Sequence, residues 1–214
     1  MTAEDTRNAI LDAAEDLFAR SGFEATSLRA ITKKADVNLA AVNYHFGTKE
    51  NLAKAVLSRR FAFVNEERFR RLDALEANGG ASRAEDILRA FLEPAMMLGD
   101  CGGKVCAMVG RLLGEQPPFL RPYLVSEMRA VMERFVDALA RALPKAPRSS
   151  LSWRLAFTAG ALVHTLLHAR VMATMWDQKE VDTMAVLEEL VGYALGGLSA
   201  SSEKTSVPGS EGRR

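Results

Sequence analysis

Basic and hydrogen-bonding side chains gather in one short stretch of the chain, residues 26–49. The stretch contains two short helical patterns, at residues 28–35 and 39–45, and the polar break Asp36-Val37-Asn38 separates them. Two short helices joined by a turn of about three or four residues define the helix-turn-helix, whose second helix enters the major groove of DNA N-terminus first. The spacing therefore predicts a unit that reads DNA.

The side chains on the predicted outer surface of this unit suit a nucleic acid. Asn pairs with N6 and N7 of adenine, a small Ala or a Leu packs against a thymine methyl group, and Tyr, His, Ser, Thr and Lys donate to phosphates. Gly47 is expected to end the second helix, which places Lys49 beside the next helix N-terminus, where a phosphate is favoured. The residues predicted to contact DNA are Thr26, Ser27, Arg29, Asn38, Leu39, Ala40, Asn43, Tyr44, His45 and Lys49.

The charge of the whole chain hides this local pattern. With 28 Lys and Arg against 27 Asp and Glu, the 214 residues carry a net charge of only +1, an ordinary globular balance. Residues 25–60 nevertheless contain seven cations and two anions, an excess of five positive charges. A concentrated excess of this kind predicts an electrostatic footprint for a polyanion.

Two runs within this region resemble a known family. Residues 22–27, GFEATS, and residues 44–52, YHFGTKENL, resemble the N-terminal domain of the TetR family of transcriptional repressors. The resemblance is dense over about residues 7–56, and the rest of the chain matches only in plan. Within the family, residues 38–44, NLAAVNY, resemble the regulators of fatty-acid metabolism.

The resemblance implies roles for particular residues. Tyr44, His45 and Lys49 are then phosphate contacts, and Asn43 is a base contact. It also implies a small effector bound between the helices of a second domain. The expected function is a ligand-responsive, sequence-specific repressor that leaves a palindromic operator when a small hydrophobic effector binds, with a fatty acyl compound as one candidate.

Apolar residues recur at helical spacing along the remaining chain, and no strand alternation stands out. We predict an all-α protein of about nine to ten helices. A helix over residues 7–21 completes the reading unit, and an uninterrupted helix over 48–78 is the lever between domains. Further helices are predicted from residue 82, with a kink or end at Pro94, and over residues 105–115, 119–143, 151–175 and 181–195.

This pattern predicts a division of the chain into three parts. Residues 1–49 form the helix-turn-helix DNA-binding domain, and residues 50–198 form a helical ligand-binding and dimerisation domain. The Ser, Gly, Glu and Arg content of residues 199–214 predicts a disordered tail.

The second domain is rich in methionine and aromatic residues, with few polar groups among them. Plain core packing accounts for many of these residues, but an adaptable apolar wall with sparse polar groups is also typical of a ligand site. The residues predicted to contact the effector are Met97, Met108, Arg111, Leu112, Phe119, Tyr123, Phe135, Trp153, Phe157, His164, His168 and Met172.

The helix around residues 155–167 is apolar on nearly every side and must be covered on every side. Palindromic DNA also requires two reading heads, so we predict a homodimer with an isologous four-helix interface. Its predicted contacts are Leu162, Leu166, Ala169, Leu187, Leu190 and Val191.

The remaining chemistry is sparse. His164 and His168 share a helix face, but Thr165 stands where a zinc peptidase has Glu. Cys101 and Cys106 are expected to be free thiols in a reducing compartment. A metal- or redox-sensing dimeric regulator stays as the alternative function.

No nucleophile elbow, phosphate loop or paired-carboxylate arrangement occurs, so no enzyme, cofactor or metal is predicted. The N-terminus has no apolar signal region, and no stretch of transmembrane length is uninterruptedly apolar. We therefore expect a cytoplasmic protein with double-stranded DNA, a small hydrophobic effector and a second copy of itself as partners.

Overall fold

The computed structural model describes residues 2–77, 82–99 and 104–200. These residues form nine helices and no strand, which confirms the predicted all-α class and the predicted number of helices. Most of the predicted tail lies outside the described residues.

Three helices form the N-terminal unit: α1 (Ala3–Ser21), α2 (Leu28–Ala35) and α3 (Leu39–Phe46). Helix α1 begins four residues earlier than predicted because Thr2 and Asp5 form a capping box. The backbone N–H of Thr2 donates to the Asp5 carboxylate at 2.8 Å, and the backbone N–H of Asp5 donates to the Thr2 hydroxyl at 3.1 Å. The N-terminus of α1 is therefore fixed by its own first residues.

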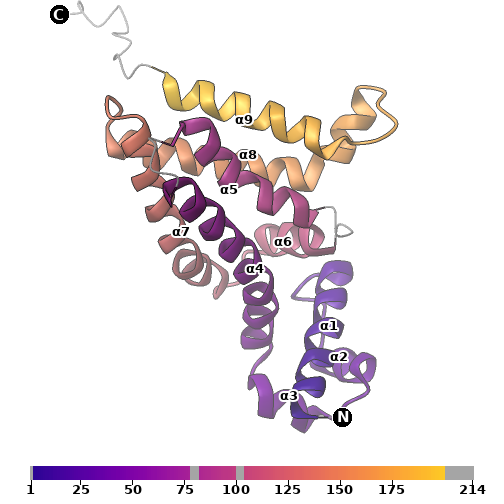
Figure 1. The fold of residues 1–214 in the computed structure, drawn as a ribbon. Helices are drawn as coiled ribbons and strands as arrows, with labels where there is room; N and C mark the ends of the chain where they lie inside the picture. Colours follow the sequence, from indigo (N-terminus) through magenta and orange to yellow (C-terminus); the bar gives the residue numbers. More distant parts are fainter. Residues whose placement is uncertain (1, 78–81, 100–103, 201–214) are drawn as a thin grey trace, which may run out of the picture.

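Six further helices follow, and the first of them, α4, runs between the two ends of the molecule. Helix α3 lies at one end of the molecule, α8 and α9 lie at the other, and α4 runs between them (Figure 1). The sequence predicted that the helix from residue 82 would kink or end at Pro94. Helix α5 continues through Pro94 to Gly99, so the proline does not end it. The bounds are α4 (Lys49–Ala77), α5 (Ala84–Gly99), α6 (Lys104–Glu115), α7 (Leu120–Ala142), α8 (Arg148–Met175) and α9 (Thr183–Ser199).

Two apolar clusters hold the helices together. The upper cluster begins at Leu72 of α4 and joins α5, α7, α8 and α9. The lower cluster joins α1, α2 and α3 to the first half of α4 through Leu52 and Val56, and it also takes in Met108 and Leu112 of α6. Helices α4 and α6, which follow the domain boundary predicted at residue 49, therefore pack against the helices that precede it. The boundary itself stays a prediction.

An ion-pair group fixes α4 against α1. Glu15 of α1 is only 6% exposed, and its carboxylate accepts bonds from Arg59 (2.8 Å) and Arg60 (2.6 Å) of α4. Burial alone would raise the pKa of Glu15, but the bonds from Arg60 and Arg59 outweigh burial and hold that pKa below its usual value. The ionised carboxylate therefore stabilises the folded state.

Replacing this carboxylate should remove a pH-dependent part of the stability. Because the folded pKa is depressed, the contribution is present above the unfolded pKa of about 4.3 and is lost as the pH falls through the folded value. We expect Glu15→Gln to lower the melting temperature by roughly 5 °C at pH 7. The difference from wild type should shrink as the pH falls below about 4.3. The exposed Glu66→Gln is the control in these thermal melts; a pH-independent difference would contradict the assignment.

Candidate nucleic-acid interface

Helices α2 and α3, eight residues each, form the predicted pair and meet at a sharp turn. Asp36 ends α2 in the left-handed conformation, with φ 54°, which redirects the chain within a few residues. Ile31, Val42 and Phe46 are buried against α1. The opposite faces of both helices are therefore left for solvent or a partner.

Helix α3 presents a row of exposed side chains that begins at its N-terminus. Leu39 is 43% exposed and Tyr44 is 83% exposed, and both Ala40 and Asn43 are also exposed. The Tyr44 ring meets the half-buried His45 ring edge-on, with 5.0 Å between centroids. These residues combine apolar contacts for thymine methyl groups with an amide for base edges.

The predicted contacts Ser27 and Asn38 each cap a helix. The Ser27 hydroxyl accepts from the backbone N–H of Ala30 at 3.1 Å, and Asn38 Oδ1 accepts from Ala41 at 2.8 Å. Both side chains remain exposed beside helix N-termini, where anions bind. Thr26 differs: it is 3% exposed and its hydroxyl donates to the Gly22 carbonyl at 2.6 Å. The Thr26 hydroxyl is therefore used inside the protein, and its contact with DNA stays a prediction.

Lys49 also has a role that the sequence did not reveal. Its ammonium donates to the backbone carbonyls of Phe23 (2.9 Å) and Thr26 (3.1 Å), and it lies 4.3 Å from the centre of the Phe23 ring. A third carbonyl, that of Glu24, lies at 3.4 Å. Lys49 was predicted as a phosphate donor, but in this structure its ammonium holds the loop between α1 and α2.

The positive excess of residues 25–60 is partly neutralised by α1. Lys34, Arg59 and Arg60 each pair with a carboxylate of that helix. Arg29 and Lys33 of α2 are exposed and have no ion pair within the described part of the chain. Fewer cations than the sequence predicted are therefore left to bind phosphates, and Arg29 and Lys33 of α2 are among them.

Side chains of helix α6 also bind the backbone of the α1–α2 junction. Glu115 accepts from the backbone N–H groups of Phe23 (2.9 Å) and Glu24 (3.1 Å), and the Nε atom of Arg111 donates to the Ala19 carbonyl at 3.0 Å. A Cβ atom at Gly22, where φ is 83°, would lie 1.9 Å from Glu115 Oε1. Only glycine therefore fits this junction while Glu115 keeps its position.

Sequence reasoning missed Glu115 altogether. Its spacing from Arg111 is typical of an ion pair within a helix. Instead, Arg111 binds the backbone of α1, and Glu115 binds the backbone of the loop between α1 and α2.

The residues predicted to surround an effector lie in different parts of the structure. One group, Met108, Arg111, Leu112, Phe119 and Tyr123, contacts the N-terminal unit or belongs to the lower cluster. Others lie outside: Met97 is 50% exposed, and the α8 side chains Trp153, Phe157, His164 and His168 are all exposed. Phe135 is fully buried in the upper cluster, and Met172 is half-buried. The predicted effector contacts therefore have several different surroundings in this structure, and their role in binding an effector stays a prediction.

A hollow of about 510 Å³ lies elsewhere, beside the far end of α4. Arg134 and Arg141 line it, but both pair with Glu76. None of the predicted effector contacts lines this hollow.

The described residues contain no group of three or more His, Cys, Asp or Glu side chains placed to hold a metal ion. His164 and His168 stack with 4.5 Å between ring centroids. The side chains of Cys101 and Cys106 lie outside the described residues.

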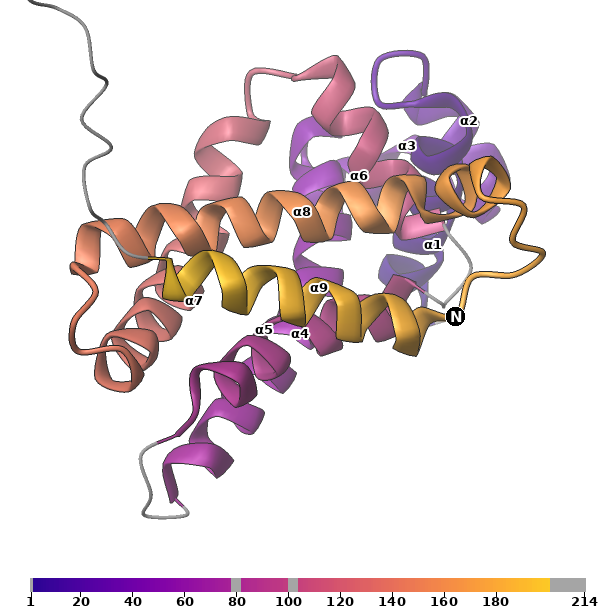
Figure 2. The ribbon, with the colours of Figure 1, turned by 90° about the horizontal axis from the view of Figure 1, so that it is seen from above.

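The predicted dimer contacts divide into two sets. Leu162, Leu187, Leu190 and Val191 are at most 7% exposed and belong to the chain's own core, so a partner chain cannot reach much of them. Leu166 and Ala169 are half-buried. The outer faces of α8 and α9 carry other apolar residues instead, and the two helices run side by side in both views (Figures 1 and 2).

The outer face of α8 carries large exposed apolar side chains, with the exposed His164 and His168 between them. It includes Trp153 (67% exposed), Phe157 (65%), Val171 (56%) and Met175 (68%). Among the described helices, α8 alone has the length and composition to cross a membrane, and only 17% of its most apolar window is buried. Sequence reasoning had found no uninterrupted stretch, and the helix contains Arg154, His164 and Arg170. An apolar face of this extent needs cover from outside the chain.

The geometry of this interface agrees with comparisons to known proteins. Residues 10–56 match the family described as "Bacterial regulatory proteins, tetR family". Residues 89–197 match "Tetracyclin repressor-like, C-terminal domain", which covers about half of the chain. The chain belongs to the TetR family of transcriptional regulators.

Relatives within the TetR family match chiefly at the N-terminus. A helix-turn-helix transcriptional repressor of Mycobacterium tuberculosis is 52% identical over 54 residues, which are 25% of this chain and 29% of that protein. The regulator UidR of Escherichia coli is 36% identical over 55 residues, 26% of this chain and 28% of that protein. The chain thus spans less than a third of the length of these relatives.

Solved TetR-type structures match over nearly the whole chain. A TetR-like regulator from a Rhodococcus species has a TM-score of 0.61 at 22% identity, covering 92% of this chain and 97% of that one. The fatty acid degradation regulator FadR of Bacillus halodurans has a TM-score of 0.67 at 18% identity, with the same coverage. At such identities these structures establish the shared fold.

The different positions of Lys49 and Arg29 predict different effects of mutation. Lys49→Met should lower the melting temperature of the free protein because it leaves the carbonyls of the α1–α2 loop without their donor. Arg29→Ala should leave the melting temperature unchanged, weaken DNA binding on all sequences about equally and reduce the salt slope by about one. Thermal melts and DNA titrations at several salt concentrations compare the two. An unchanged melting temperature in Lys49→Met would show that its loop contacts carry no stability.

Proposed function

We propose that this TetR-family regulator is a repressor that binds a palindromic operator as a homodimer and is released by a small effector. The observation that carries the proposal is the row of exposed side chains on α3. The Asn38 cap fixes the start of this helix, and the residues at its N-terminus are exposed to solvent. As a DNA-binding regulator it acts in the cytoplasm, where bacterial DNA is found.

Each exposed residue has a role that fits its chemistry. Asn43 pairs with adenine, and Leu39 and Ala40 pack against thymine methyl groups. Tyr44 and His45 contact the phosphate backbone together with the α2 residues. Because α2 contributes Arg29, Lys33 and the Ser27 cap, the backbone contacts surround the base contacts and fix their register.

This assignment predicts a change of specificity when Asn43 is replaced. Asn43→Ala should relax the preference at one base pair of each half-site, at a cost of about 1–3 kcal/mol on the preferred sequence. Selection of bound sequences from random duplexes measures this, and for wild type it should return a palindrome with half-sites roughly 34 Å apart. A uniform loss on all sequences, as expected for Arg29→Ala, would place Asn43 on the backbone instead.

The two-fold symmetry of such an operator requires a dimer, and the outer face of α8 and α9 supplies the surface. The Trp153 and Phe157 rings lie 6.0 Å apart on this face, and Tyr193 of α9 is 71% exposed. Gly160, Gly192 and Gly196 are also exposed, so the helices of a second copy can approach closely. An isologous four-helix contact buries all of these residues at once.

Introducing a charge into this face should separate the dimer. We expect Phe157→Asp to be monomeric by light scattering at micromolar concentration, because a carboxylate buried at an apolar interface has no counterion. Phe63→Asp is the matched control, since Phe63 is 61% exposed on α4, away from α8 and α9, and this variant should remain dimeric. A dimeric Phe157→Asp would place the contact on another surface.

Release by an effector needs a connection between the domains, and α6 supports that role alongside α4. An effector that favours a state with α6 displaced would release the bonds of Arg111 and Glu115 to the α1–α2 junction and shift the reading helix. A hundredfold relief of repression needs a coupling of only about 2.7 kcal/mol. A fatty-acyl effector is supported by the resemblance of residues 38–44 and by the fold shared with FadR.

A further inference from the structure

A row of polar groups separates the two apolar clusters inside the protein. Ser58, Asn65 and Arg68 follow one another along α4, between Leu57 at the end of the lower cluster and Leu72 at the start of the upper one. Ser58 Oγ lies 3.0 Å from the hydroxyl of Tyr123 on α7. Asn65 is 9% exposed and Arg68 only 4%. The row therefore places polar chemistry in an otherwise apolar interior.

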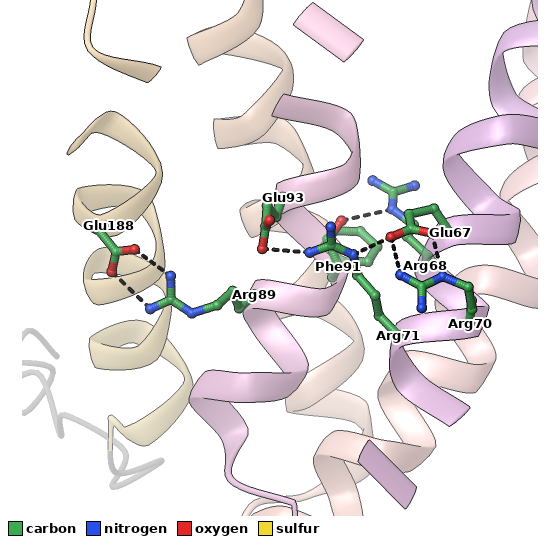
Figure 3. A network of polar contacts seen from close by, with 8 residues as sticks. All are labelled: Glu67, Arg68, Arg70, Arg71, Arg89, Phe91, Glu93 and Glu188. Carbon is green, nitrogen blue, oxygen red and sulfur yellow. Dashed lines mark hydrogen bonds and ion pairs between the residues drawn. The ribbon is translucent and has the colours of Figure 1, made fainter. Parts of the chain in front are cut away.

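Arg68 is a buried cation that uses only part of its binding capacity. Its Nε atom donates to the Phe91 carbonyl at 2.8 Å (Figure 3). Its Nη1 atom donates to Asn65 Oδ1 at 3.1 Å. The guanidinium carbon lies 4.3 Å from the centre of the Phe91 ring. A guanidinium has five N–H groups, so these two bonds leave three without a partner among the described residues.

The nearby carboxylates are already paired with other arginines. Glu67 accepts from Arg70 (2.7 Å) and Arg71 (2.7 Å), and Glu93 pairs with Arg71 at 2.6 Å (Figure 3). Within the described part of the chain, Arg68 has no ion pair. Burial lowers the pKa of Arg68 to about 10, which still leaves it protonated at neutral pH.

A buried charge without a counterion is costly, and the Phe91 ring offsets only part of that cost. A bound anion would supply the missing charge and accept the remaining N–H groups. The Phe91 ring that Arg68 contacts packs against the Phe135 ring, with 5.2 Å between centroids, and both rings belong with Met96 to the upper apolar cluster. These groups exclude a strongly hydrated ligand body and suit an apolar one, and methionine adapts to its shape.

We propose that Arg68 anchors the carboxylate of the effector, which is therefore a monoanionic acid with an apolar body. It rests on the proposed function, because it names the chemical class of the effector. The planar guanidinium binds a carboxylate through two parallel N–H groups, a geometry that an uncharged alcohol of the same length cannot match. Arg68 thus makes the charge of the ligand, as well as its length, a condition for binding.

The test compares acids with alcohols on the full chain. Octanoate, dodecanoate and hexadecanoate are titrated against wild type beside the matching primary alcohols, with binding measured by calorimetry and thermal shift. We expect at least one acid to bind wild type tenfold or more tightly than its alcohol, and Arg68→Met to bind the two equally. Arg89→Met is the matched control, because Arg89 pairs with Glu188 near the surface, and it should keep the preference.

The free proteins provide a second readout. Their thermal melts show whether each variant folds, because Arg68→Met removes a buried charge but also takes a donor from the Phe91 carbonyl and from Asn65. If Arg68→Met does not fold, Arg68→Lys decides, since it keeps the charge but loses the fork and should reduce acid binding without changing alcohol binding. Equal binding of every acid and its alcohol by wild type, or a preference that survives the loss of Arg68, would overturn the inference.

Operator binding by the same proteins separates this inference from the proposed function. Arg68→Met should bind the operator as tightly as wild type does, and the acid should release only wild type. An acid that releases both proteins equally would overturn the role of Arg68 and leave the proposed function standing. An acid that binds through Arg68 but releases neither protein would support the anchor and overturn release by this effector.

Discussion

The structure depends on one loop, the junction between α1 and α2, which is held from both sides through its backbone. Lys49 binds its carbonyl groups, and Glu115 binds its N–H groups. A short loop has few side-chain contacts of its own, so these charge-assisted bonds fix its conformation. Because Lys49 starts α4 and Glu115 ends α6, the position of the reading unit is tied to both helices that enter the second domain.

The fixed junction determines how the other parts of the structure are placed relative to the reading unit. A rigid α1–α2 junction keeps α2 and α3 in register, so that the α3 row and the cations of α2 face the same partner. The buried Arg68 lies on α4, between the two apolar clusters, where a ligand can change the packing of both. The outer face of α8 and α9 lies at the far end, where a second copy can bind without covering α3 (Figure 1).

Much of the fold could be predicted because its signals are local. The caps at Ser27 and Asn38, the turn at Asp36 and the periodicity of each helix depend on residues within about four positions. The start of α1 was placed too late because the Thr2 and Asp5 capping box precedes the first apolar residue of the pattern. On the site, the exposure of Asn43 and Tyr44 followed from the same periodicity, whereas the burial of Thr26 did not.

The sequence by itself determined the class of protein, the reading motif and the residues that α3 exposes, since these follow from short-range spacing. Only the tertiary structure decided which charges are used internally: Lys49 on the loop, Lys34 on Asp16, and Glu115 on Phe23, a contact that spans 92 positions. It also decided that the predicted effector residues lie in the two apolar clusters or at the surface, and that Arg68 is buried without an ion pair among the described residues. The physical reason is that helix packing brings distant side chains together, and periodicity specifies which face of a helix is apolar but not which helix covers it.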